Sequence, residues 1–246
     1  YSTNITPDRP FGIGNYTRAD FHRALKDGIG KEKGNLYPAM PFVFTHITTE
    51  SDLDALYAYM MSIPAMEIPN AQNTGVFAWP VRPFMNFWTL LNFPNRDKPN
   101  DEARSGAWNR GAYLVEGLAH CGACHSPRNF MMGVKFKDAL AGGFEDGMAI
   151  PDITAEALSK HGYNLDRLTE YLATGISPEG TSFAGMNTVT HFSTSQMDKA
   201  DVKAMATYLL TDRAGKLLSQ QTSPIASNQV IGAMKKGDAE AGYDLY

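Results

Sequence analysis

The residues of this chain best suited to chemistry are gathered in one short motif, Cys121-Gly122-Ala123-Cys124-His125. Two thiols one helical turn apart can add across the two vinyl groups on one edge of a porphyrin, and the adjoining imidazole then points at the iron. The chain has 2 cysteines, and both lie in this motif. The spacing is typical of covalent haem c attachment, with Cys121 and Cys124 as the thioether residues and His125 as the proximal iron ligand.

Three other interpretations compete with haem attachment. A redox-active dithiol of the thioredoxin type lies next to a βαβ pattern, whereas this motif lies in a helical, glycine-rich region. A zinc site needs a second pair of Cys or His ligands at suitable spacing, and the sequence has no further cysteine. The third alternative is a chance match in a structural loop. The sequence favours haem attachment over all three.

Two segments of the chain follow the same plan, which predicts an internal repeat. Each segment has an Ile-Thr turn, a helix, a Gly-Ile pair, a loop that carries a methionine, and a second helix. The first copy contains Ile5-Thr6, Phe21–Ile29, Met40 and Leu53–Tyr59, and the second contains Ile153-Thr154, Leu168–Ile176, Met186 and Val202–Tyr208. The repeated plan predicts two related helical domains.

The repeat also selects a second iron ligand. A thioether sulfur is a known axial donor to haem iron, but the chain has 12 methionines, so residue type alone decides nothing. Met186 follows Gly180–Gly185 in a predicted loop between two helices, and Met40 holds the same place in the first copy. We therefore predict that Met186 is the distal ligand of the haem at His125. Core packing, the usual role of methionine, is the alternative.

Four histidines outside the motif are alternative nitrogen ligands: His46, His120, His161 and His191. None of them has a counterpart in the other copy of the repeat, so we predict that they are surface or core residues. His191 is the strongest of these alternatives, because it follows Met186 in the same region of the chain.

Local signals support the predicted helices. Three pairs have the spacing of a capping box with Asp in place of Glu, namely Thr17 with Asp20, Thr49 with Asp52 and Ser195 with Asp198. Gly28 and Gly175 fall where each preceding helix should end in a left-handed residue. Strand signals are sparse. The sequence therefore predicts a mainly α fold.

The segment at residues 65–104 separates the two copies, and its repeated prolines exclude a long helix. Its aromatic residues are predicted to cover a flank of a domain or to dock a partner subunit. Residues 219–232 are rich in Ser, Gln and Pro and are predicted to form a second linker. The domain prediction is a first domain at 1–64, the linker, a second domain with the motif at 105–218, and a linker with the start of a third domain at 219–246.

Charge and hydropathy argue against nucleic-acid binding and against a membrane-spanning segment. The net charge is −4, and no basic run is longer than Lys235-Lys236, so nucleic acid is not a predicted partner. No stretch approaches the roughly 18 to 20 consecutive apolar residues that span a bilayer. We therefore predict that no part of this sequence crosses a membrane unaided.

The residues around the motif resemble those of a known family. Arg110–Val115 leading into His120–Asn129, together with Tyr1–Asp8 and Leu36–Pro41, is similar to the triple-haem cytochrome c subunit of bacterial membrane-bound dehydrogenases. This family includes cytochrome subunits of quinone-linked alcohol, aldehyde, gluconate, sorbitol and fructose dehydrogenases, and the resemblance covers nearly the whole chain. It implies tandem class I cytochrome c-like domains joined by the Pro- and aromatic-rich linker.

The family has three haem motifs, whereas this sequence has one. The resemblance implies that Met40 is the distal ligand of a neighbouring haem whose motif lies outside this sequence. Ala241–Tyr246 is similar to Arg110–Val115 and would lead into a third motif. We therefore expect an internal portion of a longer chain, with one haem c attached here and up to three in the intact subunit. The alternative is a one-haem relative in which Met40 is structural.

The resemblance implies an electron-transfer subunit without a catalytic centre of its own. Its partner would be a catalytic dehydrogenase subunit that holds pyrroloquinoline quinone, FAD or molybdenum, with a small third subunit, and its acceptor would be membrane ubiquinone. The expected location is the periplasm, on the outer face of the inner membrane, with attachment through partners or through parts outside this sequence. Arg128 is expected to pair with a haem propionate, and an ordinary surface arginine is the alternative. A soluble periplasmic carrier and a haem peroxidase are the alternative functions.

Overall fold

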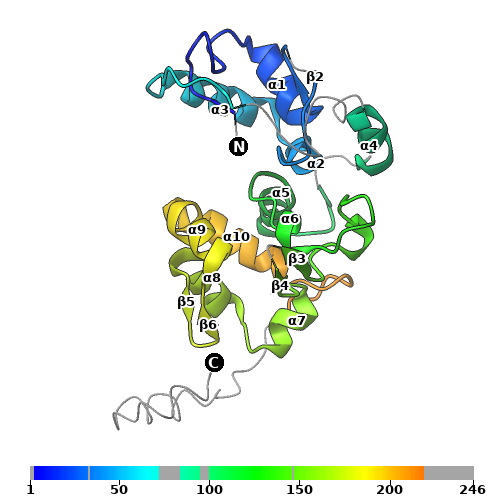
Figure 1. The fold of residues 1–246 in the computed structure, drawn as a ribbon. Coiled ribbons are helices and arrows are strands. Elements are labelled where there is room, and N and C mark those ends of the chain that lie inside the picture. Colours follow the sequence, from blue (N-terminus) through cyan, green and yellow to red (C-terminus); the bar gives the residue numbers. More distant parts are fainter. Residues whose placement is uncertain (1–2, 33, 72–83, 95–99, 146, 219–246) are drawn as a thin grey trace, which may run out of the picture. The chain divides into compact units, whose positions relative to one another are not determined.

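The computed structural model describes residues 3–32, 34–71, 84–94, 100–145 and 147–218 (Figure 1). Within these ranges helices predominate, and the strands form three two-stranded antiparallel hairpins. This confirms the predicted mainly α fold. The second predicted linker and the predicted start of a third domain, at 219–246, lie outside the described residues, as do residues 72–83 and 95–99 of the first linker.

The chain divides into two compact units, and each is described by itself. The first unit comprises residues 1–100 and 113–150, and the second comprises residues 101–112 and 151–246. The predicted domain boundaries after residues 64, 104 and 218 stay predictions. None of the helices in the described part of the chain is both long enough and apolar enough to span a bilayer.

The first copy of the repeat forms one half of the first unit. Its elements are α1 (Arg18–Lys26), the hairpin of β1 (Ile29–Gly30) and β2 (Gly34–Asn35), α2 (Phe42–Thr45) and α3 (Glu50–Ser62). The apolar face of α1 is buried against Leu53 of α3, through Phe21, Ala24 and Leu25. This buried cluster holds the two longer helices of the copy together.

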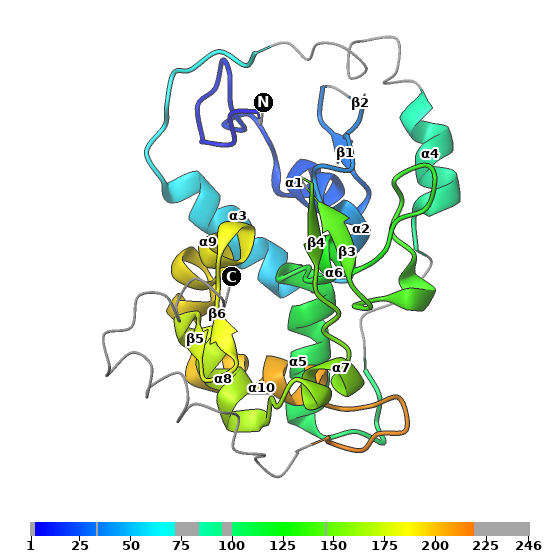
Figure 2. The same ribbon diagram turned by 60° about the horizontal axis from the view of Figure 1, so that its bottom comes forward.

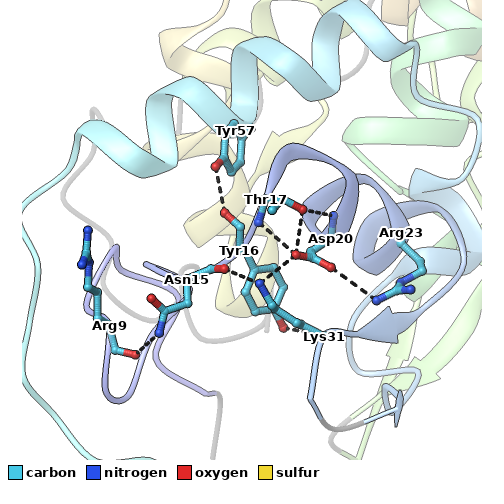
Figure 3. Close-up of polar contacts among 8 residues, drawn as sticks. All are labelled: Arg9, Asn15, Tyr16, Thr17, Asp20, Arg23, Lys31 and Tyr57. Carbon is cyan, nitrogen blue, oxygen red and sulfur yellow. Dashed lines mark hydrogen bonds and ion pairs between the residues drawn. The ribbon is translucent and has the colours of Figure 1, made fainter.

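Polar contacts fix the start of α1, as Figure 3 shows. Thr17 accepts a hydrogen bond from the backbone N–H of Asp20, and the Asp20 carboxylate accepts one from the backbone N–H of Thr17, which is the predicted capping box. Lys31 lies 3.0 Å from the same carboxylate. Hydrogen bonds from Thr17 and then from Lys31 hold the pKa of Asp20 well below its usual range. Tyr57 of α3 donates to the carbonyl of Tyr16 at 2.8 Å and joins the cap to the second helix.

The second half of the first unit carries the predicted haem motif. Its elements are α4 (Met85–Asn92), the π-helical turn η3 (Leu114–Leu118), α6 (Gly122–His125), the 3-10 turn η4 (Phe136–Asp138) and the hairpin of β3 (Gly143–Glu145) and β4 (Met148–Ile150). A second apolar cluster joins this half to the first copy: Phe42, Val43 and Phe44 of α2 are buried with Trp88 of α4, and Phe136 packs against them. The predicted linker is therefore partly core, because Trp88 is buried.

The second unit contains the second copy of the repeat. Its elements are α5 (Gly106–Tyr113, of which Tyr113 belongs to the first unit), α7 (Ala155–Lys160), α8 (Leu165–Thr174), the hairpin of β5 (Ile176–Ser177) and β6 (Gly180–Thr181), α9 (Ala184–Phe192), the 3-10 turn η5 (Thr194–Gln196) and α10 (Lys199–Leu209). Its core comes mainly from α8 and α10, through Leu168, Leu172, Val202, Met205 and Leu209.

Helices α5 and α10 approach closely because α5 has a glycine at the crossing. A Cβ at Gly111 would overlap the carbonyl oxygen of Ala204 and crowd Tyr208. Trp108 lies edge-on to Tyr208, with ring centroids 5.2 Å apart. The Arg110 guanidinium donates two hydrogen bonds to the Asp201 carboxylate, at 2.8 and 2.7 Å. Packing and a bidentate ion pair thus fix this crossing.

Two details of the sequence prediction are wrong. The last predicted capping box fails, because Asp198 is the N-cap residue of α10 and Ser195 lies in η5, where its hydroxyl donates to the carbonyl of His191. The predicted loop position of Met186 is also wrong, because helix α9 begins at Ala184 and Met186 lies in its first turn. Thr49 is the N-cap of α3 as predicted, and Gly28 (φ 67°) and Gly175 (φ 77°) adopt the predicted left-handed conformation.

Candidate haem site

The motif forms a single helical turn. Cys121 is the N-cap residue of α6, and its carbonyl accepts hydrogen bonds from the N–H groups of Cys124 and His125 at 3.3 and 3.0 Å. Residues three apart on a helix share a face, so Cys121 and Cys124 lie on the same side of this turn. Cys124 is exposed and Cys121 is half-buried, and neither forms a disulfide. This arrangement suits two thioether bonds to one porphyrin edge.

The chain around α6 leaves little room for the motif to shift. The carbonyl of His125 accepts a hydrogen bond from the N–H of Gly142 at 2.9 Å. A Cβ at Gly143 would overlap the carbonyl oxygen of Cys124, so only glycine allows β3 to approach this closely. Figure 2 shows the β3–β4 hairpin beside α6. Ser126 is buried, and its hydroxyl accepts the N–H of Leu140 at 3.0 Å. These contacts preorganise the motif.

Arg128 binds backbone carbonyl groups. Its guanidinium donates to the carbonyl of Ala123, inside the motif, at 2.7 Å and to the carbonyl of Met132 at 3.1 Å. It also lies 3.6 Å from the carboxylate of Glu145 on β3. Arg128 therefore links the motif to the loop that follows it and to the hairpin. Its predicted pairing with a haem propionate stays a prediction.

The backbone has a positive φ directly before the haem motif and again two residues before Met186. His120 directly precedes the motif and has φ 37°, and Ala184, at the start of the turn that carries Met186, has φ 48°. This conformation costs a residue with a Cβ of order 1 kcal/mol, and such strain is concentrated at functional sites. Burial lowers the pKa of His120 and raises the pKa of the Cys121 thiol to about 12. No signal in the sequence indicates this strain, since neither residue is Gly, Asn or Asp.

Exposed apolar side chains accompany the predicted ligands in each unit. In the first unit, Phe144 and Met148 of the β3–β4 hairpin are 68% and 38% exposed. In the second unit, Phe183, Val189 and Phe192 are exposed on or beside α9, the helix of Met186, and Ile176 is exposed on β5. A porphyrin is a large apolar plate that needs such walls, and burying them would be favourable. The residues present fit a haem.

Met186 and Met40 differ in their surroundings. Met186 is half-buried on α9, among the exposed side chains of the second unit. Met40 is half-buried and packs on both apolar clusters of the first unit. The motif belongs to the first unit and Met186 to the second, so their pairing as ligands of one iron stays a prediction. The same holds for Met40 and a neighbouring haem.

The other histidines have no common location. His46 is the C-cap residue of α2, with its ring 5.0 Å from that of Phe93. His161 is the C-cap residue of α7, and His191 is exposed on α9 with its ring 4.6 Å from that of Phe192. Among the described residues, no three His, Cys, Asp or Glu side chains gather as a zinc site would require.

Comparison with known proteins decides the family. No protein-family model matches the chain. A nicotinate dehydrogenase subunit of Pseudomonas putida is 40% identical over 210 residues, which cover 85% of this chain and 18% of that protein. The fructose dehydrogenase cytochrome subunit of Gluconobacter japonicus is 36% identical over 212 residues, which cover 85% of this chain and 44% of that protein. A diheme cytochrome c-type protein of Cereibacter sphaeroides is 35% identical over 211 residues, which cover 84% of this chain and 69% of that protein. The chain belongs to the c-type cytochromes.

The names of these relatives indicate the role and the cofactor of the cytochrome. Two of the three carry names of dehydrogenase subunits, one of them a cytochrome subunit, and the third is named as a diheme cytochrome. Electron transfer is therefore the role of this cytochrome, and haem c is its cofactor. The chain spans less than half the length of the first two relatives.

Proposed function

We propose that this cytochrome attaches one haem c through Cys121 and Cys124, with His125 as proximal and Met186 as distal iron ligand. The observation that carries the proposal is the geometry of α6, in which Cys121, Cys124 and His125 lie within one helical turn. The exposed apolar side chains of the β3–β4 hairpin, which lies beside α6, support it, because contact with a porphyrin would remove them from water.

Bound haem supplies one-electron transfer. The protein's own residues hold and orient it. His125 is positioned by the bond from Gly142 to its carbonyl, and the motif turn is positioned by Arg128. Met186 lies at the start of a helix, where the strained residue Ala184 sets the direction of the first turn. Arg128 is the candidate partner of a propionate, and its present contacts with two carbonyl groups would compete with that role.

Met40 is the proposed distal ligand of a neighbouring haem in a longer chain, which would carry up to three haems in tandem cytochrome c-like domains. Met40 supports this role by its place in the repeat: it follows the hairpin of the first copy as Met186 follows that of the second. Its contacts with both apolar clusters are those of a residue at the edge of a core.

The proposed role of the whole subunit is an electron relay in a quinone-linked dehydrogenase complex. Its relatives' names include a fructose dehydrogenase and a nicotinate dehydrogenase. A catalytic subunit with pyrroloquinoline quinone, FAD or molybdenum would oxidise an alcohol, aldehyde or sugar, and the cytochrome would pass the electrons to ubiquinone. A small third subunit and a place on the periplasmic face of the inner membrane complete this proposal.

The test is a spectrum of the haem-loaded protein together with one substitution. We expect a reduced c-type α band and one covalent haem by mass. Met186→Ala should keep the covalent haem, lower its reduction potential and let carbon monoxide bind the reduced iron. Met197→Ala is the matched control, because Met197 is also half-buried in the second unit. An unchanged potential and no carbon monoxide binding in Met186→Ala would show that another residue is the ligand.

A further inference from the structure

Two hydroxyl side chains join the β5–β6 hairpin to helix α9, which carries Met186 (Figure 1). Ser182 follows the hairpin, and Thr190 is buried on α9. Their hydroxyl oxygens lie 3.0 Å apart, and the Thr190 hydroxyl donates to the carbonyl of Asn187 at 3.1 Å. Because a hydroxyl group has a single proton, Ser182 is the donor to Thr190. This hydroxyl pair thus forms a chain of hydrogen bonds that ends at the residue after Met186.

The start of α9 has no capping side chain of its own. Its N-cap residue is Phe183, which makes no side-chain hydrogen bond to the helix, and Ala184 follows with φ 48°. Helices α7 and α8, by contrast, are capped by Thr154 and Asn164, whose side chains each accept a backbone N–H. A helix end without a cap leaves its first N–H groups without a side-chain partner. The turn that holds Met186 therefore depends on contacts from outside it.

Those contacts come from α8. Gly175 ends that helix with φ 77°, and its carbonyl accepts the N–H of Ser182 at 2.7 Å. A Cβ at Gly175 would lie 2.5 Å from the Ser182 hydroxyl and 2.9 Å from the Thr190 hydroxyl, so the hydroxyl pair lies directly against this glycine. Beyond α9, the Thr194 hydroxyl donates to the carbonyl of Leu172 in α8. The segment between these contacts is therefore held on α8 at both ends.

The first copy of the repeat has apolar side chains in the same places. Leu36 donates its N–H to the carbonyl of Gly28 at 2.6 Å, so a leucine stands in the place of Ser182. The ring of the buried Phe42 lies against the same glycine, in the place of Thr190. Apolar contact can thus hold a turn of this kind, but it is non-directional. Hydrogen bonds restrict the direction of the backbone more narrowly.

We infer that Thr190 is a positioning residue for the distal ligand: together with Ser182 it holds the first turn of α9 so that Met186 reaches the haem iron. The inference rests on the proposed function, because it takes Met186 to bind the iron. A functional side chain must be held within about 0.5 Å of its productive position. Methionine has a flexible side chain, so a fixed backbone leaves it fewer alternative positions. Loss of the hydroxyl pair would shift the population from methionine-bound iron to open iron.

Carbon monoxide binding to the reduced, haem-loaded protein tests the inference, because it reports open iron. Thr190→Val keeps the shape of the side chain, removes its hydroxyl and leaves Ser182 without its acceptor. We expect the apparent affinity for carbon monoxide to rise about ten-fold, the factor expected when the methionine-bound state loses one buried hydrogen bond. The reduction potential should fall as well. Thr190→Ser keeps the hydroxyl and should restore wild-type values of both.

Thr207→Val is the matched control, because it makes the same chemical change on a neighbouring helix. The Thr207 hydroxyl donates to the carbonyl of Lys203 within α10, at 2.8 Å. Its carbon monoxide affinity and its potential should equal those of the wild type. Wild-type values in Thr190→Val overturn the inference. Equal changes in Thr190→Val and Thr207→Val also overturn it, since they would report a general loss of stability.

Met186→Ala separates this inference from the proposed function. Wild-type values in Met186→Ala show that another residue is the ligand, and the proposed function then fails. If Met186→Ala opens the iron and Thr190→Val does not, the inference alone fails. In protein that already carries Met186→Ala, Thr190→Val should add no further change, and an additional ten-fold rise would contradict action through Met186.

Folding and haem loading are read separately, from the α band and the mass of the covalent haem. Both should match the wild type in every variant, because the hydroxyl pair belongs to the second unit and the motif to the first. Should Thr190→Val fail to hold haem, Ser182→Ala is the second test. It removes the donor and leaves the bond from Thr190 to Asn187 in place. A wild-type affinity for carbon monoxide in Ser182→Ala would overturn the inference.

Discussion

The two copies of the repeat use the same backbone devices in different surroundings. The Ile-Thr turn of each copy is built alike: Thr6 donates its N–H and hydroxyl to the side chain of Asn4 at 2.9 and 2.7 Å, and Thr154 donates to Asp152 in the same way at 2.8 and 2.6 Å. In each copy the helix before the hairpin, α1 or α8, is followed by a left-handed glycine and a hairpin of two-residue strands. The repeat is therefore structural as well as a pattern of residue types.

Two further hydrogen bonds place the methionines in register. Leu36 donates its N–H to the carbonyl of Gly28 at 2.6 Å, and Ser182 donates to that of Gly175 at 2.7 Å. Met40 and Met186 each follow the donor by four residues. The two copies also share a buried threonine that bonds to a helix carbonyl: Thr45 to Leu25 and Thr194 to Leu172.

The two copies differ in how deeply the residues beside the methionine are buried. The helix after Met40 is α2, whose Phe42, Val43 and Phe44 are all buried in the first unit. The helix that holds Met186 is α9, which leaves Val189 exposed. The repeat therefore determines the position of the methionine in the sequence, whereas the residues packed around it determine whether they form a buried core or stay exposed.

The largest expected effect concerns the crossing of α5 and α10 in the second unit. Gly111→Ala places a methyl group on the carbonyl of Ala204, and because backbone cannot rotate away, we expect the free energy of unfolding of the second unit to fall by about 3 kcal/mol. Gly106→Ala is the control on the same helix, because nothing lies within 4 Å of a Cβ at that position. It should raise the free energy of unfolding by about 0.5 to 1 kcal/mol. Urea unfolding followed by segment-resolved hydrogen exchange measures both. An equal loss of unfolding free energy in both variants would contradict the close packing of α5 on α10.

The next effect compares the two left-handed glycines. Gly28→Ala should cost about 2 to 3 kcal/mol, because the new methyl group would lie 2.6 Å from the ring of the buried Phe42. Gly175→Ala should cost about 1 to 2 kcal/mol, because the nearest atom, 2.5 Å away, is the rotatable hydroxyl of Ser182. Thermal unfolding of each variant is the measurement. Equal losses would mean that the tighter packing of the first copy has no energetic consequence.

A smaller effect concerns the methionines themselves. Met40→Ala should lower the free energy of unfolding of the first unit by about 1 to 2 kcal/mol, because Met40 is half-buried against both apolar clusters. In protein without haem, Met186→Ala should cost less than about 1 kcal/mol, since its neighbours on α9 are exposed. Urea titrations of both variants give the comparison. A larger loss in Met186→Ala than in Met40→Ala would reverse the difference between the copies.

The smallest effects concern Asp52 in α3 and Asp201 in α10, which each lie three residues after the N-cap residue of their helix. Asp52 accepts the hydroxyl of the buried Tyr113 at 2.5 Å, and Tyr113→Phe should cost about 1 kcal/mol. Asp201 is held by Arg110, and Arg110→Ala should cost about 0.5 kcal/mol, because both groups are partly exposed and screened by solvent. Lys199→Ala, at an exposed position on α10, is the neutral control.

The pH dependence of the second pair has a definite sign. The Arg110 guanidinium lowers the pKa of Asp201 below its ordinary value. A carboxyl group with a lowered folded pKa stabilises the protein above its unfolded pKa of about 4, and that contribution is lost as the pH falls. The difference in unfolding free energy between wild type and Arg110→Ala should thus be present at pH 7 and vanish in acid, once the pH has fallen through the folded pKa. A difference that persists there would mean that Arg110 acts through packing.

Much of the local structure of this cytochrome could be predicted from its sequence. The motif at Cys121–His125, the capping box at Thr17 and the glycines that end two helices depend on contacts within one turn, so residue types and spacing determined them. The repeat was readable because the same short-range devices recur in order. Relatives confirmed the electron-transfer role that the motif and the resemblance had predicted.

Tertiary structure decided the features that join distant segments. No spacing rule connects Trp88 to Met131, or Arg128 to Glu145, and the helical start of α9 at Ala184 needed a left-handed residue that sequence rules assign to glycine. Whether an apolar residue is core or surface depends on which segment packs against it. Residue types and their spacing were enough to predict the haem motif and the capped helices, because these depend on local geometry. The burial of Trp88 on α4 and the anchoring of α6 depended on long-range packing, which only the folded chain decides.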